Sequence, residues 1–83
     1  MTNLELVELV IELAQEVEAE DPIDWGMLPI DEKDTYALIA SSVVENILAQ
    51  GDSPITDREI SLLASTTKLA VENFVLNIKL NQL

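Results

Sequence analysis

Carboxylates are the side chains through which this sequence could do chemistry. It contains sixteen aspartates and glutamates, only four lysines and arginines, and neither cysteine nor histidine. Disulfides and the usual zinc ligands are therefore excluded, and no serine can be activated by a histidine. The remaining option is a metal site made of carboxylate oxygens, which is the chemistry of calcium and magnesium sites.

The segment from Asp21 to Glu32 has the length and two of the markers of a helix–loop–helix calcium site. With Asp21 at position one of the loop, Gly26 falls at position six and Glu32 at position twelve, as that motif requires. Positions three and five, which must supply oxygen ligands, are occupied by Ile23 and Trp25. We therefore expect no calcium site here, and no metal or cofactor elsewhere in the chain.

Two families of helical proteins would bring an activity with them. The overall profile resembles the acyl carrier proteins, which are similarly short and acidic and bear their prosthetic arm on the serine of an Asp-Ser-Leu motif. Here Asp52-Ser53 is followed by Pro54 inside a turn. All-α nucleotide pyrophosphohydrolases hold magnesium with a Glu-Glu-x-x-Glu and a later Glu-x-x-Asp, and residues 5–12 contain no double glutamate. A small carrier or hydrolase stays an alternative, but we predict that the chain is not an enzyme and has no catalytic residue.

The negative charge is concentrated at the start of the chain. Residues 1–34 hold eleven acidic groups and one lysine, a net charge of −10, whereas residues 35–83 hold five acidic and three basic groups, a net charge of −2. Such a field repels phosphate backbones and anionic lipid, so neither a nucleic acid nor a membrane is expected as a partner. No apolar run reaches the roughly 18–20 residues of a membrane span, and the first residues lack the basic flank of a signal peptide. We expect a cytoplasmic protein.

Capping signals divide the chain, which we expect to form a single domain over residues 1–83, into three helices. Thr2–Glu5 and Thr56–Glu59 are capping boxes, and Ile55 and Ile60 are placed as a hydrophobic staple around the second box. Asp31 is a candidate N-cap for a helix between them. That helix is expected to end at Gly51, and residues 19–31, with Pro22, Gly26 and Pro29, are expected to form a loop.

Apolar residues at helical spacing give each predicted helix a face toward the core. In the first helix this face is Leu6, Leu9, Val10, Leu13, Ala14 and Val17, opposite Glu5, Glu8, Glu12 and Glu16. In the second helix it is Tyr36, Ile39, Ala40, Val43, Val44 and Ile47. In the third helix it is Ile60, Leu63, Ala64, Thr67, Ala70, Val71, Phe74 and Ile78. Trp25 is expected to pin the loop to the helices, with Ile23, Met27 and Leu28 beside it.

The third helix carries a second apolar stripe on the side opposite its core face. This stripe consists of Leu62, Leu69, Leu76 and Leu83 at seven-residue spacing, with Leu80 nearby. A helix on the outside of a three-helix monomer has no use for leucines on both sides, and the repeat is that of a helix seam against a partner. Alternatively, these leucines close the bundle within one chain or cover the proline-containing loop. We predict an all-α three-helix bundle with a Pro/Gly-containing loop between its first two helices, oligomeric through the third.

One stretch of the sequence resembles a group of known proteins. The run from Glu20 to Gly26, followed by Tyr36-Ala37 and by residues 40–45, is similar to small uncharacterised proteins of marine cyanobacterial tailed phages. The resemblance covers roughly residues 20–48. It implies a phage or marine origin and brings no activity with it.

Two non-catalytic functions follow from these patterns. The leading hypothesis is a self-associating protein–protein interaction or structural module, with an unidentified protein as a further partner. The alternative is an inhibitory decoy, in which the acidic first helix and loop imitate phosphates and occupy a basic site on a nucleic-acid-binding protein.

Overall fold

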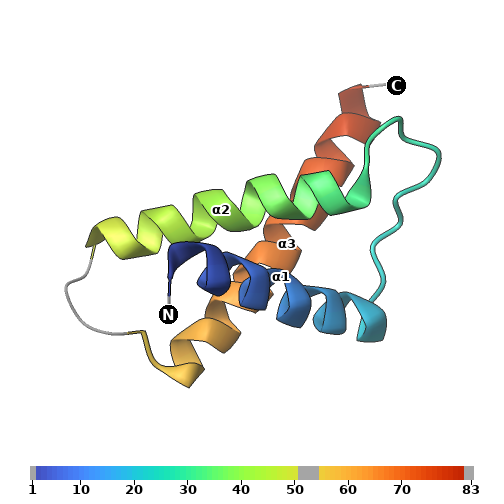
Figure 1. Cartoon of the computed structure of the whole chain (residues 1–83). Helices are drawn as coiled ribbons and strands as arrows, with labels where there is room; N and C mark the ends of the chain where they lie inside the picture. Colours follow the sequence, from blue (N-terminus) through green and yellow to red (C-terminus); the bar gives the residue numbers. More distant parts are fainter. Residues whose placement is uncertain (1, 51–54, 82–83) are drawn as a thin grey trace.

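The computed structural model describes residues 2–50 and 55–81, and within these ranges it contains three helices and no strand. The helices are α1 (Asn3–Glu20), α2 (Glu32–Gln50) and α3 (Asp57–Asn81). Each packs against both of the others, and α3 crosses α1 and α2 obliquely (Figure 1). This confirms the prediction of an all-α protein with three packed helices. None of the three helices has an apolar stretch long enough to cross a bilayer.

Both predicted capping boxes are present. The Thr2 hydroxyl accepts a hydrogen bond from the Glu5 backbone N–H at 3.1 Å, and the Glu5 carboxylate accepts one from the Thr2 backbone N–H at 3.3 Å. Thr56 and Glu59 exchange the same two bonds at 3.2 and 3.4 Å. Each box satisfies backbone donors that have no partner within the helix, which fixes where α1 and α3 begin.

Asp31 caps α2, as predicted. Its carboxylate accepts a hydrogen bond from the Asp34 backbone N–H at 3.0 Å, and its backbone carbonyl accepts one from the Thr35 hydroxyl at 2.8 Å. The predicted C-terminal cap, Gly51, lies outside the described residues.

The core consists of two adjoining clusters to which all three helices contribute. One contains Leu6, Val10, Ala40, Val44, Ile60 and Leu63. The other contains Ala14, Ile23, Tyr36, Ala64, Val71 and Val75. Ile23 comes from the segment between α1 and α2, so that segment is part of the core at this end of the molecule.

The buried face of α3 differs from the predicted one in its second half. Val75 and Lys68 are buried, whereas Phe74, which was expected in the core, is 42% exposed. The reason is that residues 21–30 fold over α3 and cover the side on which Lys68 and Val75 lie. The periodicity of apolar residues in α3 does not indicate which side of this helix the segment after α1 covers, so it could not predict that Lys68 and Val75 are buried.

Residues 21–31 connect α1 to α2 without regular structure. Gly26 has φ of +62°, a left-handed conformation that a glycine adopts without strain. Trp25 is half-buried and Ile23 is buried, but Met27 is fully exposed. The expectation that Met27 packs beside Trp25 was therefore wrong, because the turn at Gly26 directs the next residue toward solvent. At the end of α2, Ile47 is likewise more exposed than predicted.

Candidate interaction surface

A carboxylate at the end of α1 holds the connecting segment to the helices. One Glu18 oxygen accepts a hydrogen bond from the Trp25 indole N–H at 2.9 Å, and the other accepts one from the Tyr36 hydroxyl at 2.5 Å. The two aromatic rings lie 6.2 Å apart at an interplanar angle of 48°. Glu18 thus joins α1, the connecting segment and α2, and both of its oxygens are used for structure.

Two lysines of α3 also bind the same segment. The Lys68 ammonium lies 3.1 Å from the Asp21 carboxylate and 3.3 Å from that of Glu72. Lys79 lies 3.1 Å from the Asp24 carboxylate and also donates to the Asp24 backbone carbonyl. The side chain of Lys68 is only 2% exposed, so its charge depends on these two partners. Asp21, the first position of the calcium-like loop, therefore already forms an ion pair with Lys68.

Both buried titratable groups of this network have raised pKa values. Burial raises the pKa of the Tyr36 hydroxyl above its ordinary value of 10.0, and the hydrogen bond to Glu18 raises it further. Burial alone would lower the pKa of Lys68, but its hydrogen bonds to Asp21 and Glu72 outweigh that effect and raise the pKa above 10.5. Tyr36 is therefore neutral and Lys68 charged at physiological pH, which suits a structural role.

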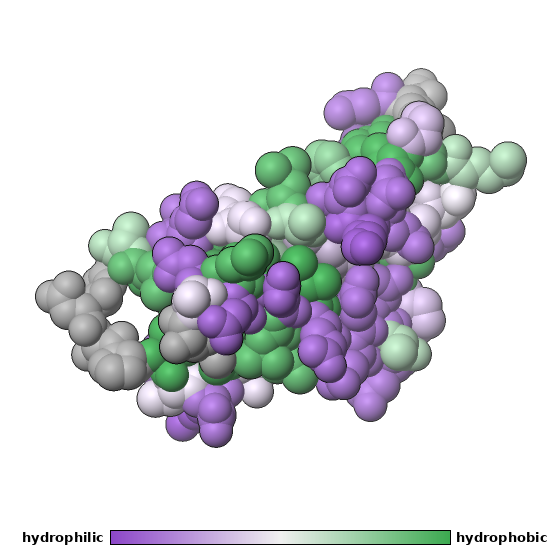
Figure 2. All heavy atoms as spheres, in the orientation of Figure 1, coloured by the Kyte–Doolittle hydropathy of each residue, from purple (hydrophilic) through white to green (hydrophobic). Residues whose placement is uncertain are grey.

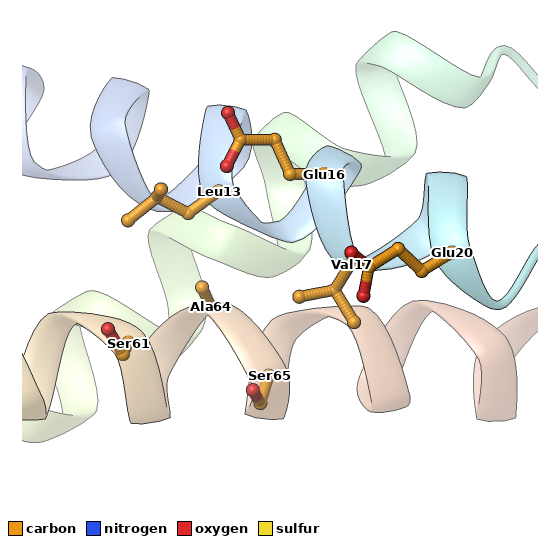
Figure 3. Close-up of a pocket in the computed structure, with 7 residues that line it drawn as sticks. All are labelled: Leu13, Glu16, Val17, Glu20, Ser61, Ala64 and Ser65. Carbon is orange, nitrogen blue, oxygen red and sulfur yellow. The ribbon is translucent and has the colours of Figure 1, made fainter.

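The cleft between α1 and α3 does not bring reactive groups together. It has a volume of 240 Å³ and is lined by Leu13, Val17 and Ala64 together with polar residues of both helices. Ser61 and Ser65 come from α3, while Glu16 points away from that helix (Figure 3). Within residues 2–50 and 55–81, no three acidic side chains lie close enough to hold a metal ion.

The outer surface of α1 is acidic. Glu5, Glu8, Glu12, Glu16 and Glu20 are all exposed. Figure 2 shows hydrophilic side chains gathered toward the C-terminal end of α1, with hydrophobic side chains visible over its first half. Like charges one turn apart repel each other, so these residues, apart from Glu5 in its capping box, contribute to solubility rather than to the stability of the helix.

The outer surface of α3 has the opposite character. The exposed fractions are 59% for Leu62, 56% for Leu69, 50% for Leu76 and 65% for Leu80. At 1.5 Å per residue, this row of leucines is about 27 Å long. The fifth predicted interface residue, Leu83, lies outside the described residues. The other four thus have no partner within the described part of the chain that removes them from solvent.

Charged side chains are few on this surface: Glu72, one turn from both Leu69 and Leu76, is 31% exposed, and Lys79 is 29% exposed. Between Ile60 and Asn81, every other exposed residue of α3 is uncharged: Ser61, Leu62, Ser65, Thr66, Leu69, Asn73, Phe74, Leu76, Asn77, Leu80 and Asn81. In a chain with a net charge of −12, this is the surface on which another acidic molecule meets the least repulsion. We call the exposed residues Leu62, Leu69, Leu76 and Leu80, with their uncharged neighbours, the outer face of α3.

Two further exposed apolar residues were not predicted as part of an interface. Leu38 is 73% exposed on α2, and Phe74 is 42% exposed on α3. Leu38 does not belong to the helical stripe of α2, and Phe74 was assigned to the core by its periodicity. The signal that could have identified Leu38 is its position opposite the core face of α2, where a soluble monomer prefers a polar residue.

Comparison with known proteins identified no similar molecule. Neither protein-family models, nor curated proteins, nor solved structures gave a match to this chain. The function proposed below accordingly rests on the residues of the chain and their geometry.

Proposed function

We propose that this protein is a non-catalytic interaction module that self-associates through the outer face of α3. The observation that supports this function is the row of four leucines, at least half exposed, on a helix that already buries its opposite side in the core. Single exposed leucines are common on monomers, but an uncharged row about 27 Å long indicates a contact surface.

The size of the protein favours the same conclusion. A chain of 83 residues buries a smaller part of its surface than a large domain does, and it has no cysteine with which to form a disulfide. Removing the outer face of α3 from water in an oligomer would add apolar burial that the single chain cannot provide. The glutamates of α1 lie on another face and would stay in solvent.

The test of this function is sedimentation equilibrium of the wild-type chain and of a variant with Leu69→Glu and Leu76→Glu. We expect the wild type to dimerise or oligomerise and the variant to sediment as a folded monomer. Both substitutions place charge on exposed positions, so circular dichroism should show that the helices remain. A second variant, with Leu69→Ser and Leu76→Ser, removes the apolar contacts without adding charge and should also weaken association.

Leu4 provides the matched control. It is a leucine of similar exposure, 67%, but it lies at the start of α1 next to Glu5. Leu4→Glu should leave the association constant unchanged within about twofold. A folded wild-type monomer at high micromolar concentration would contradict the proposed function.

The acidic face of α1 supports a second candidate function, the decoy that occupies a basic site. Its glutamates are exposed about one turn apart along the helix, and they make a row of negative charge. A decoy should capture basic nucleic-acid-binding proteins from a lysate and lose them steeply as salt rises. Replacing Glu8 and Glu12 with glutamine should abolish that capture, whereas the leucine variants of α3 should retain it.

A further inference from the structure

We propose that the connecting segment, residues 21–31, is a strap that opens as a unit while the three helices stay packed, and that the ion pair between Lys68 and Asp21 is its latch. The proposal goes beyond self-association, because it concerns the part of α3 that this segment covers rather than the outer face of α3. In Figure 1 the segment is the connection that runs from the cyan end of α1 to the green start of α2.

The connecting segment contributes to only one of the two core clusters. Ile23 belongs to the cluster that contains Val75. Three partly buried residues of the segment pack against the same cluster: Trp25, Leu28 and Ile30. The other cluster, which contains Val10 and Val44, takes no residue from the segment among those that the structure describes. Opening of the segment therefore uncovers one cluster and leaves the other intact.

Side chains rather than the backbone hold the connecting segment closed. Among the described residues, the N–H groups of residues 22–30 make one backbone–backbone hydrogen bond, from Trp25 to the Ile23 carbonyl at 3.1 Å. That bond lies within the segment, and Pro22 and Pro29 have no N–H to donate. A segment whose backbone is not bonded to the helices opens at a lower free energy than the helices themselves.

Both ends of the connecting segment are fixed without help from α3. The Asp21 N–H donates to the Val17 carbonyl at 3.1 Å and closes the end of α1. At the other end, the Asp31 carboxylate accepts the Asp34 N–H at 3.0 Å and caps α2. The segment can therefore leave α3 while α1 and α2 keep their caps, and the two capping residues are its hinge points.

The polar contacts of the connecting segment with α3 are ion pairs at the edge of solvent. The Asp21 and Asp24 carboxylates lie 3.1 Å from the ammonium groups of Lys68 and Lys79, and their side chains are 81% and 89% exposed. Opening therefore returns both aspartates to water and leaves neither of them buried without a partner. Opening also breaks the bond from the Trp25 indole to Glu18.

Lys68 couples the position of Asp21 to closure of the whole segment. Its side chain is 2% exposed, and its second partner, Glu72, lies one turn along the same helix at 3.3 Å. When the segment opens, Asp21 leaves, Glu72 stays with the lysine, and water reaches the ammonium group. A closed segment without the Asp21 contact would bury the ammonium with one partner fewer, which is costly. The segment therefore opens when this contact is lost.

Thiol alkylation tests whether the segment opens independently, since the chain has no cysteine of its own. Val75→Cys places a thiol in the cluster under the segment, and Val44→Cys places one in the other cluster. Both valines are 1% exposed. We expect Val75→Cys to react at least about tenfold faster, at a rate that changes little with urea, because local opening exposes little surface.

The Val44→Cys variant is the control for global unfolding. Its alkylation requires the bundle to unfold, so its rate should rise steeply with urea. Equal rates for the two variants with the same urea dependence would overturn the proposal, because the segment would then open only together with the helices.

The latch is tested by Asp21→Asn in the Val75→Cys chain, with Glu20→Gln as the matched control. Each substitution removes one exposed carboxylate at the end of α1, but Asp21 is the one that pairs with Lys68. Asp21→Asn should raise the alkylation rate by about fivefold or more, and Glu20→Gln should change it less than about twofold. Equal effects of the two substitutions would contradict a latch at Asp21.

A double-mutant cycle identifies the partner of Asp21. In a Lys68→Met chain, Asp21→Asn should have no effect on the alkylation rate, because the methionine needs no carboxylate. The same acceleration in the presence and in the absence of Lys68 would exclude this lysine as the other half of the latch.

Hydrogen exchange tests the same opening in a chain without an added cysteine. Trp25 is the only tryptophan, so its indole N–H gives a single resonance. Asp21→Asn should lower the protection of this N–H several-fold and leave that of the Val44 amide unchanged. An equal loss at both groups would mean that the substitution loosens the whole bundle, which contradicts the proposal even if Val75→Cys fails to fold.

The strap and the proposed function fail in different ways. A wild-type chain that stays monomeric contradicts self-association, but Val75→Cys should still react faster than Val44→Cys in that monomer. Equal reactivity of the two cysteines in a chain that does associate contradicts only the strap.

Discussion

Thr67 is the residue whose chemistry fits its surroundings least. Its side chain is completely buried in α3, and the hydroxyl has no hydrogen-bond partner among the residues that the structure describes. A buried hydroxyl without a partner costs about 1–3 kcal/mol, whereas valine has the same shape and no polar atom. We expect Thr67→Val to raise the free energy of unfolding by about 1 kcal/mol, measured by urea denaturation at fixed protein concentration.

Thr35 is the matched control for that substitution. It is also buried, but its hydroxyl donates a hydrogen bond to the Asp31 carbonyl at 2.8 Å. Thr35→Val should therefore lower the free energy of unfolding by about 1 kcal/mol, the usual contribution of such a bond. If both variants lose stability to the same extent, the Thr67 hydroxyl has a partner after all.

Tyr36 and Lys68 make stability depend on pH on the alkaline side. Burial and the Glu18 bond raise the pKa of Tyr36, and the carboxylates of Asp21 and Glu72 raise that of Lys68. A group with a raised pKa holds its proton more tightly in the folded state, so its stabilising effect is complete below the unfolded pKa and is lost as pH rises through the folded value. With unfolded values of 10.0 and 10.5, the free energy of unfolding should be constant from about pH 8 to 9.5 and fall above 10.

The chain has one tyrosine, so its ionisation can be followed directly by ultraviolet absorbance. We expect the tyrosinate signal to appear together with unfolding rather than before it. In Tyr36→Phe the fall in stability above pH 10 should be shallower, because only the lysine contribution remains. A tyrosinate signal that appears at pH 10 in the folded protein would contradict the raised pKa.

At the scale of elements, the connecting segment depends on Glu18. This carboxylate accepts the indole N–H of Trp25 and the hydroxyl of Tyr36, and hydrogen bonds to a charged group contribute about 1.5–3 kcal/mol each when buried. Because these bonds are only part-buried, we expect Glu18→Ala to lower the free energy of unfolding by about 2 kcal/mol in total. The fluorescence of Trp25, the only tryptophan, should shift to longer wavelength as the segment loosens.

Glu16→Ala is the control, since Glu16 lies on the same helix and is exposed. It should change neither the fluorescence nor the stability by more than about 0.5 kcal/mol. Equal effects of the two substitutions would mean that Glu18 acts only through its charge in α1.

The same element shows which features could be predicted from the sequence. The starts of all three helices depend on side chains within three residues of the backbone groups they satisfy, so Thr2, Asp31 and Thr56 were correctly identified as caps. The burial of Lys68 could not be predicted, because it depends on Asp21, which is 47 residues away. Hydropathy would assign a lysine to the surface, and only the folded segment provides its partner.

The candidate interface was predicted only in part, because spacing within one helix can be read from the sequence and packing between helices cannot. The leucines of α3 follow a repeat within one helix, so their common face could be identified from spacing alone, and the described ones are exposed. Leu38 and Phe74 come together only because α2 and α3 pack against each other. A cleft between two helices is a property of their packing, and no single stretch of sequence contains it.

At the scale of the whole molecule, acidic and uncharged surfaces are separated. A row of exposed glutamates lies on α1, while the fully exposed residues of α3 after its first turn are uncharged and its partly exposed Glu72 and Lys79 are in ion pairs. Association through α3 therefore keeps the most acidic helix of each copy away from the contact. The two copies still approach as bodies of net charge −12, so long-range repulsion opposes an association that the contact itself favours.

This separation predicts the salt dependence of self-association. Raising salt from about 20 to 300 mM shortens the Debye length from roughly 20 Å to about 6 Å, which screens the repulsion between the two acidic bodies. The contact proposed here contains no ion pair that salt could weaken, and apolar burial is not reduced by screening. We expect the dissociation constant to fall several-fold over this range in sedimentation equilibrium.

A variant with Glu8→Gln and Glu12→Gln, which removes two charges remote from α3, should associate more tightly at low salt and show a smaller salt dependence. A dissociation constant that rises with salt would mean that ion pairs form the interface, and the uncharged face of α3 would then not be the surface through which the chain associates.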